Sequence, residues 1–464
     1  MSRQKPFQEK ALTTCVMVLL TFSICCSNSF SAEPMPVRML VESLPNPFIA
    51  GQGGFTGVWT QAYWESTFAQ MQQQGYNALS YYANPWTTSQ WQSYMIYNSE
   101  YPEAKEYTDQ QIDQVVNHLR WVFSRAHDYG IKSYLFCHFV YTPRPFAEAH
   151  DFARDLPVSE TVHGNHNNPN LNYVWGVRNE LTRAYTEAAI AEDLQLYPAL
   201  DGLMGTMGES MPGKRSTWYS EAVVPGMRRS GRATNPVFIL FHWIMPFEDF
   251  MKDIAPSSVY DKTWLAIEHN GEQIDSVQVY PTSKRWAEES GLPTIVQIVP
   301  HNVDGEWYRS VSPQIGSHDS PKFAYEMIDQ YKRIKNCVGF NYHYLAGDNN
   351  NLLFKQSLGY YGSNDVPYSD DPWLDILETR FGSRTAAQHI LKAYDISARI
   401  TPEVGALAWC PHDFYCHARL SLRFWFFSEQ NTNWGYFSTP AREGGLMLLP
   451  PRYYARAFAR NRNY

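Results

Sequence analysis

The feature that most constrains the fold is a repeated alternation between short apolar runs and longer amphipathic segments. Eight apolar runs follow one another along the chain. They are 37–41, 78–82, 132–139, a short run at Leu203 and Met204, 236–243, 263–268, 294–299 and 338–344. Continuous apolar strands separated by amphipathic helices are typical of a parallel sheet that is buried on both faces. Eight strands are the number that closes a (β/α)8 TIM barrel, so we predict this α/β fold. The alternative is an open doubly wound sheet, but no Gly-rich phosphate loop follows the first run.

The amphipathic segments predict helices between the strands. The clearest one begins at Thr108 and Gln111, which form the pattern of a capping box, and stops at Gly130. Further helices are expected at 63–73, 172–196 and 321–335. After the last apolar run the chain is helix-rich, at 373–380, 385–399 and 418–427. We therefore predict a catalytic barrel at 33–370 and a C-terminal helical extension at 371–464 that packs on it.

The first 32 residues have the pattern of a secretory signal peptide. Arg3, Lys5 and Lys10 form a basic start, 11–24 is an apolar run without charge, and small residues follow up to Ala32. The apolar run is too short to be a convincing membrane span. We expect residues 1–32 to be removed and the protein to be secreted or periplasmic.

Composition restricts the classes of partner. The formal net charge is −8, and no basic run remains after residue 32, which argues against a nucleic-acid partner. The same part of the chain has no apolar stretch long enough to cross a bilayer. Aromatic residues make up 15% of the sequence. Such an excess of rings suits a carbohydrate site, where ring faces meet sugar C–H groups. The oligomeric state stays open.

Four cysteines follow residue 32. Cys137 and Cys337 lie in apolar runs and are expected to be small buried residues. Cys410 and Cys416 could form a disulfide in an exported protein or remain free thiols. With His412 and His417 they could instead hold a metal, which we rank lower because zinc ligands are usually more tightly paired. No cofactor is expected.

Polar and aromatic residues gather where the predicted strands end, and in a barrel those ends form the active-site face. The residues expected to bind substrate there are Glu42, Trp86, His138, His242, Trp243, Glu268, Glu272, His301, Asn302, Asn341 and His343. Each has a structural alternative, since a histidine at a strand end is often only hydrogen-bonded within the fold.

Two further carboxylates are the candidate catalytic residues. Glu209 follows the fourth run, next to Gly208, so that a ligand can approach closely. Asp275 follows the sixth run. We expect them to approach from opposite parts of the rim, with room for a sugar between them. Glycoside hydrolysis needs one protonated acid and one ionised carboxylate; a separation of roughly 6.5–9.5 Å would give inversion, and one of about 5 Å would give retention. Glu268 and Glu272 compete for the second role.

Two other functions remain open from these residues. A metal-dependent hydrolase would use the histidines, but no His-x-His or His-x-x-x-His pattern occurs on one element. A non-catalytic carbohydrate-binding barrel would need the aromatic residues but not both carboxylates.

At these positions the chain resembles the α-glucuronidase glycoside hydrolases of families 67 and 115 and their uncharacterised relatives. Segment 201–213, Asp-Gly-Leu-Met-Gly-Thr-Met-Gly-Glu-Ser-Met-Pro-Gly, resembles the fourth-strand motif that carries the general acid, which implies this role for Glu209. Segment 270–275, Asn-Gly-Glu-Gln-Ile-Asp, resembles the sixth-strand segment whose aspartate helps to activate water, here Asp275. Segments 339–344 and 394–409 are similar to the last-strand Tyr-His segment and the following helical region.

The resemblance implies inverting hydrolysis of a bond to a uronic acid. Two positions depart from the family. Gly205 stands where the family has a lysine that helps to hold the uronate, and His301 lies where a second water-activating glutamate is expected. The resemblance therefore favours a glycosidase more than uronate specificity.

Overall fold

The computed structural model describes residues 33–48, 54–82, 98–139, 141–151, 173–175, 177–207, 213–232, 236–242, 245–256, 258–268, 279, 281–298, 319–345 and 352–407. From Met35 onward they belong to one compact unit.

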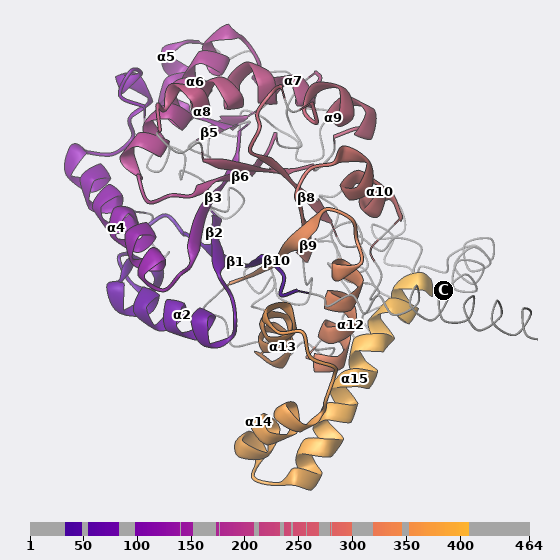
Figure 1. The fold of residues 1–464 in the computed structure, drawn as a ribbon. Helices are drawn as coiled ribbons and strands as arrows, with labels where there is room; N and C mark the ends of the chain where they lie inside the picture. The colour runs from indigo at the N-terminus through magenta and orange to yellow at the C-terminus, as the bar shows by residue number, and fades with distance from the viewer. Residues whose placement is uncertain are drawn as a thin grey trace, which may run out of the picture. The chain divides into compact units, whose positions relative to one another are not determined.

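A closed barrel of eight parallel strands forms the centre of this unit (Figure 1). Its strands are β1 (Val37–Ser43), β2 (Ala78–Tyr82), β3 (Lys132–His138), β6 (Gly202–Thr206), β7 (Val237–Phe241), β8 (Thr263–Glu268), β9 (Thr294–Ile298) and β10 (Cys337–Leu345). Their order around the barrel is β1-β10-β9-β8-β7-β6-β3-β2. Each of the eight predicted apolar runs forms one of these strands, so the predicted (β/α)8 TIM barrel is confirmed.

Successive residues of each strand face opposite sides of the barrel wall, and both sides are apolar. The inner side chains include Met39, Tyr134, Met204, Ile239 and Ile295, which pack together in one cluster. The outer side chains join a larger cluster with the helices. The barrel interior is therefore a packed core and not a pore, as expected for this fold.

Helices surround the strands (Figure 1). The longer ones are α2 (Gln61–Gln73), α4 (Asp109–Asp128), α6 (Glu180–Leu196), α10 (Pro281–Ser290), α12 (Pro321–Lys332) and α13 (Leu352–Ser363). The shorter ones are α5 (Arg144–Ala149), α7 (Arg215–Trp218), α8 (Val224–Arg229) and α9 (Phe247–Asp253), with a π-helical turn at Tyr219–Val223 between α7 and α8. Single 3-10 turns lie at Gly57–Trp59 and Pro102–Ala104.

The capping pattern predicted for α4 is present. The Thr108 side chain accepts from the backbone of Gln111, and the Gln111 side chain accepts from the backbone of Thr108. These two bonds satisfy amide groups that have no partner within the helix.

The helix predicted at 172–196 begins later than expected. Tyr173–Trp175 instead forms a short strand, β5, which pairs antiparallel with β4 (Tyr141–Pro143) outside the barrel. Helix α6 starts at Glu180, after Asn179 and Thr182 form a capping box. The aromatic and β-branched residues at 173–175 suit a strand, and the asparagine sets the helix start.

Two helices follow the barrel, α14 (Asp371–Phe381) and α15 (Arg384–Leu407). They contact each other, and α15 also contacts α12, where Arg399 pairs with Glu326 at 3.2 Å. The predicted helix at 418–427 and the two cysteines at 410 and 416 lie outside the described residues. The domain boundaries remain predictions.

Cys137 is buried and Cys337 is partly buried, and both are free. The predicted burial is therefore confirmed for Cys137, while Cys337 is only partly buried. Burial raises the pKa of the Cys337 thiol to about 12, which keeps it protonated near pH 7. No helix in the described part of the chain has the length and apolar character that a membrane crossing requires.

Candidate active site

The parallel strands bring their carboxyl ends to one mouth of the barrel. Of the residues predicted to form the site there, four have described side chains: Glu42, His138, His242 and Asn341. Glu268 and His343 are described as backbone positions near the ends of β8 and β10. The remaining predicted residues lie outside the described residues. They are Trp86, Glu209, Trp243, Glu272, Asp275, His301 and Asn302.

The strands that precede the two predicted catalytic carboxylates are described. Glu209 follows β6 and Asp275 follows β8, and these strands are separated only by β7. The expectation that the two carboxylates come from opposite parts of the rim is therefore wrong for the strands that lead to them. Neighbouring strands lie about 4.8 Å apart, so β6 and β8 are separated by about 10 Å.

An aromatic wall lines the mouth on the side of β2, β3 and β7. The His138 ring stacks on Phe136 at a centroid distance of 5.6 Å and lies 6.0 Å from Tyr82. Phe136 also contacts Phe241 edge-on at 6.3 Å. His138 follows Tyr134 and Phe136 on the inner side of β3, where the sequence predicted it. Its proposed contact with substrate stays a prediction.

Two carboxamides lie on the other side of the barrel, on β9 and β10. Asn341 is fully buried, and its Nδ2 donates to Met204 Sδ at 3.5 Å. Gln297 is 2% exposed and is the register partner of Asn341. The side-chain oxygens of both residues are buried and have no hydrogen-bond partner among the described residues. Sequence reasoning missed Gln297, although it is the one polar residue inside the apolar run at 295–299.

Glu42 faces the helix layer. It lies between Val41, which packs inside the barrel, and Ser43, whose backbone N–H donates to its carboxylate at 2.9 Å. The Tyr63 hydroxyl from α2 also donates to this carboxylate, which is only 2% exposed. These contacts give Glu42 a structural role between β1 and α2, and its predicted role in substrate binding remains a prediction.

His242 also faces outward. Phe241 takes the inner position at the end of β7, and the next ring, His242, packs against Trp286 of α10 at 4.6 Å. Burial lowers its pKa to about 4, and a hydrogen bond with the backbone of Ala266 opposes this only in part. The imidazole is therefore neutral near pH 7. The described contacts make His242 a packing residue, and substrate contact by it stays a prediction.

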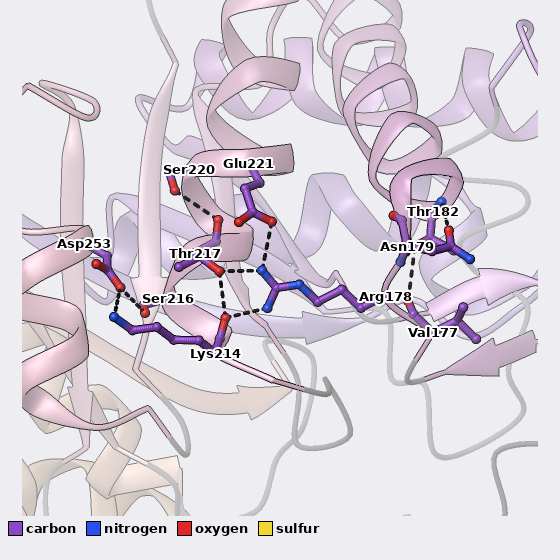
Figure 2. A network of polar contacts seen from close by, with 10 residues as sticks. All are labelled: Val177, Arg178, Asn179, Thr182, Lys214, Ser216, Thr217, Ser220, Glu221 and Asp253. Atoms are coloured by element: carbon purple, nitrogen blue, oxygen red, sulfur yellow. Dashed lines mark hydrogen bonds and ion pairs between the residues drawn. The ribbon is translucent and has the colours of Figure 1, made fainter. Parts of the chain in front are cut away.

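A polar network holds the chain directly after the segment that carries Glu209 (Figure 2). Arg178, just before α6, donates to the Lys214 carbonyl at 2.6 Å and to Glu221 at 2.8 Å, and it also bonds Thr217. The Lys214 ammonium pairs with Asp253 at 2.7 Å. The network therefore fixes the backbone and the side chain of Lys214.

Gly213, immediately before this network, has a φ of 70°. This left-handed conformation favours glycine. The described residues on the two sides of the Glu209 segment are Met207, which is buried at the end of β6, and Gly213, which directly precedes the bonded Lys214.

Gly205 stands where the resembled family has a lysine, and it has no room for a side chain. A Cβ atom there would lie 2.4 Å from the Phe139 ring and 2.6 Å from the Cys137 carbonyl oxygen. Contacts below 3.0 Å to backbone require the chain to move. The uronate-holding lysine therefore cannot be accommodated at this position without rearrangement.

Within the described ranges, no group of three or more His, Cys, Asp or Glu side chains lies close enough together to hold a metal ion. The chemistry that the described mouth offers is aromatic contact surface and uncharged hydrogen-bonding groups. That combination is typical of a site for a small polar ligand with apolar faces.

No known family model matches the chain, and no curated protein matches it. Solved structures do match. A GH138 enzyme targeting pectin rhamnogalacturonan II has a TM-score of 0.66 at 14% identity, covering 82% of this chain and 46% of that one. A family 89 glycoside hydrolase from Clostridium perfringens, solved in complex with its substrate GlcNAc-α-1,4-galactose, has a TM-score of 0.55 at 14% identity, with coverages of 78% and 41%.

A second structure of the Clostridium perfringens family 89 enzyme, with 2-acetamido-1,2-dideoxynojirimycin, has a TM-score of 0.55 at 13% identity and covers 80% of this chain and 42% of that chain. This chain spans less than half the length of these neighbours. At such low identity the likeness establishes a shared fold.

Proposed function

We propose that the protein is a secreted or periplasmic glycoside hydrolase that cleaves a glycosidic bond in a poly- or oligosaccharide. Glu209 is the general acid, and Asp275 is the base that activates water. Residues 1–32 are the signal peptide. The observation that carries the proposal is that both carboxylates follow strands of a closed parallel barrel, β6 and β8, whose carboxyl ends form one mouth.

Two further observations support this reading. The network around Lys214 fixes the attachment of the Glu209 segment (Figure 2). The fold neighbours are glycoside hydrolases, and the family 89 substrate complex was solved with a variant in which two glutamates are changed to glutamine.

The lysine that helps to hold the uronate in families 67 and 115 has no counterpart at the matching position of this chain. Gly205 replaces their lysine and sits against Phe139 without space for a side chain. The two neighbours with printed targets act on pectin rhamnogalacturonan II and on GlcNAc-α-1,4-galactose. We therefore propose a glycan substrate and test neutral and uronate-bearing sugars side by side.

The first test is a screen of the wild-type protein against neutral and uronate-bearing oligosaccharides, with new reducing ends as the readout. Binding without new reducing ends would favour the carbohydrate-binding barrel instead. Activity that disappears after dialysis against a chelator, and returns with a metal, would favour the metal-dependent hydrolase.

The second test assigns the acid. Glu209→Gln cannot donate a proton, so we expect turnover of the natural substrate to fall by about 10²–10⁴-fold. On a 4-nitrophenyl glycoside, whose leaving group needs little protonation, the loss should be smaller. The matched control is Glu180→Gln, an exposed glutamate in the first turn of α6. Turnover near the wild-type rate in Glu209→Gln would reject the role.

A further inference from the structure

The buried carboxamides of Gln297 and Asn341 have no assigned role in the proposed reaction. The alternation of the strands sets their direction. Val296 and Ile298 on β9, and Phe340 and Tyr342 on β10, all pack in the outer cluster with the helices. The residues between them therefore face the barrel interior.

The contact of Asn341 supports this inward direction. Its Nδ2 reaches Met204, which belongs to the inner cluster and lies on β6 across the barrel. Ser80 of β2 donates to the same sulfur at 3.8 Å. Gln297 is the register partner of Asn341 on one side and of Glu268 on the other. The pair thus lies at the inner wall of the barrel, where Gln297 is one residue before the end of β9 and Asn341 is at the middle of β10.

The hydrogen-bonding state of the pair is unusual for a buried position. Both side-chain oxygens are buried, and neither accepts a hydrogen bond from any described residue. Buried polar groups are nearly always paired, because an unpaired acceptor costs free energy on folding. Apolar residues of similar size would fit a barrel core better, so these two oxygens point to a donor that the described part of the chain does not supply.

The chemistry of the pair selects the ligand. Carboxamide oxygens accept hydrogen bonds, so the matching group must donate one. A sugar hydroxyl donates, whereas a uronate carboxylate only accepts. In addition, the carboxyl-terminal halves of the eight barrel strands contain no lysine or arginine that would neutralise a carboxylate. The wall beside the pair therefore offers an acceptor to a hydroxyl group and no cationic partner to a carboxylate.

We propose that Gln297 and Asn341 form the floor of a sugar subsite that accepts the hydroxyl groups of a neutral sugar and rejects a uronic acid at this position. The inference rests on the proposed function in taking a sugar as the ligand. It is tested by binding and not by turnover, so its failure is separate from the failure of the hydrolase proposal.

The experiment measures binding of methyl galactosides, methyl N-acetylglucosaminides and methyl galacturonides, in both anomers, by isothermal titration calorimetry. We expect the wild-type protein to bind at least one neutral glycoside at least about tenfold more tightly than the galacturonides. Gln297→Met and Asn341→Leu should each weaken that binding by about tenfold, as expected for loss of one buried hydrogen bond. The melting temperature of Gln297→Met should stay equal or rise, because an unpaired acceptor has been removed.

The matched control is Gln356→Met. Gln356 also has a buried carboxamide oxygen without a described partner, but it lies on α13 in the outer layer. This variant should keep the wild-type affinity. A deoxy analogue of the bound glycoside adds a second readout. When it lacks the contacted hydroxyl, it should bind the wild-type protein weakly and lose no further affinity in Gln297→Met.

Three results would overturn the proposal: galacturonides that bind as tightly as the neutral glycosides, unchanged affinity in Gln297→Met, or no binding of any neutral glycoside. Gln297→Met removes no hydrogen bond between described residues, so it keeps the test decisive even where Asn341→Leu does not fold.

Discussion

The Asp319→Asn substitution tests how the chain after β9 is tied to the chain after β10. Asp319 lies just before α12, and its carboxylate accepts from the Phe354 amide at 2.8 Å in the first turn of α13. The side chain is buried, and burial raises its pKa from 3.8 to about 6, although the amides of Phe354 and Leu353 oppose the change.

The pKa difference sets the magnitude and the sign. Between 3.8 and about 6 the folded protein holds a proton that the unfolded chain has lost. The stability from this group is therefore complete below pH 3.8 and is lost as the pH rises through about 6. The loss corresponds to about 3 kcal/mol in the free energy of unfolding. An asparagine copies the protonated form, so the variant should be up to about 3 kcal/mol more stable than wild type at pH 7.5.

The assay is urea unfolding of both proteins at several pH values from 4 to 7.5. The stability advantage of the variant should be near zero at pH 4 and complete above pH 6.5. The control is Asp261→Asn, an exposed aspartate whose replacement should change stability by less than about 0.5 kcal/mol at every pH. An Asp319→Asn variant that is no more stable than wild type at pH 7.5, or whose advantage does not change with pH, would refute the reasoning.

Two further predictions concern the mouth of the barrel. The pKa of His242 is lowered to about 4, so the free energy of unfolding of the wild-type protein should fall by about 3 kcal/mol as the pH drops from 6.5 to 4. His242→Phe should not show this fall in urea unfolding, and the pH dependence of its kcat should match that of wild type. A shifted kcat profile would place this histidine in the reaction. Arg178→Met should lower the free energy of unfolding by about 2 kcal/mol and reduce kcat more than it changes KM, because it releases the Lys214 backbone after the Glu209 segment. Arg183→Met on α6, which breaks only a pair with Glu187 at 3.5 Å, is the control, and equal kcat in both variants would contradict a positioning role.

The fold was predictable because the barrel strands are apolar on both faces. Such strands appear in the sequence as unbroken runs, and all eight runs form barrel strands. The short strands β4 and β5 were missed, since three residues are too few to show any periodicity. The sequence pattern places the residues of β5 in the helix that follows. That helix begins only after the cap at Asn179.

The site was less predictable because a rim position does not fix the direction of a side chain. One residue along a strand turns the side chain to the other face. Val41 and Phe241 face the interior, so Glu42 and His242, one residue further, face the helices. Gln297, in contrast, faces the interior although the sequence did not indicate it as a site residue. It is a single polar residue in a buried strand, and only the strand register shows that it lies beside Asn341.

The measurement that tests the central claim most directly is time-resolved proton NMR of the wild-type protein with the oligosaccharide panel, run in parallel with Glu209→Gln. The account predicts release of a sugar whose first detected anomer is opposite to that of the bond cleaved, and almost no release by the variant. Release at equal rates by both proteins, or no release from any oligosaccharide, would contradict it.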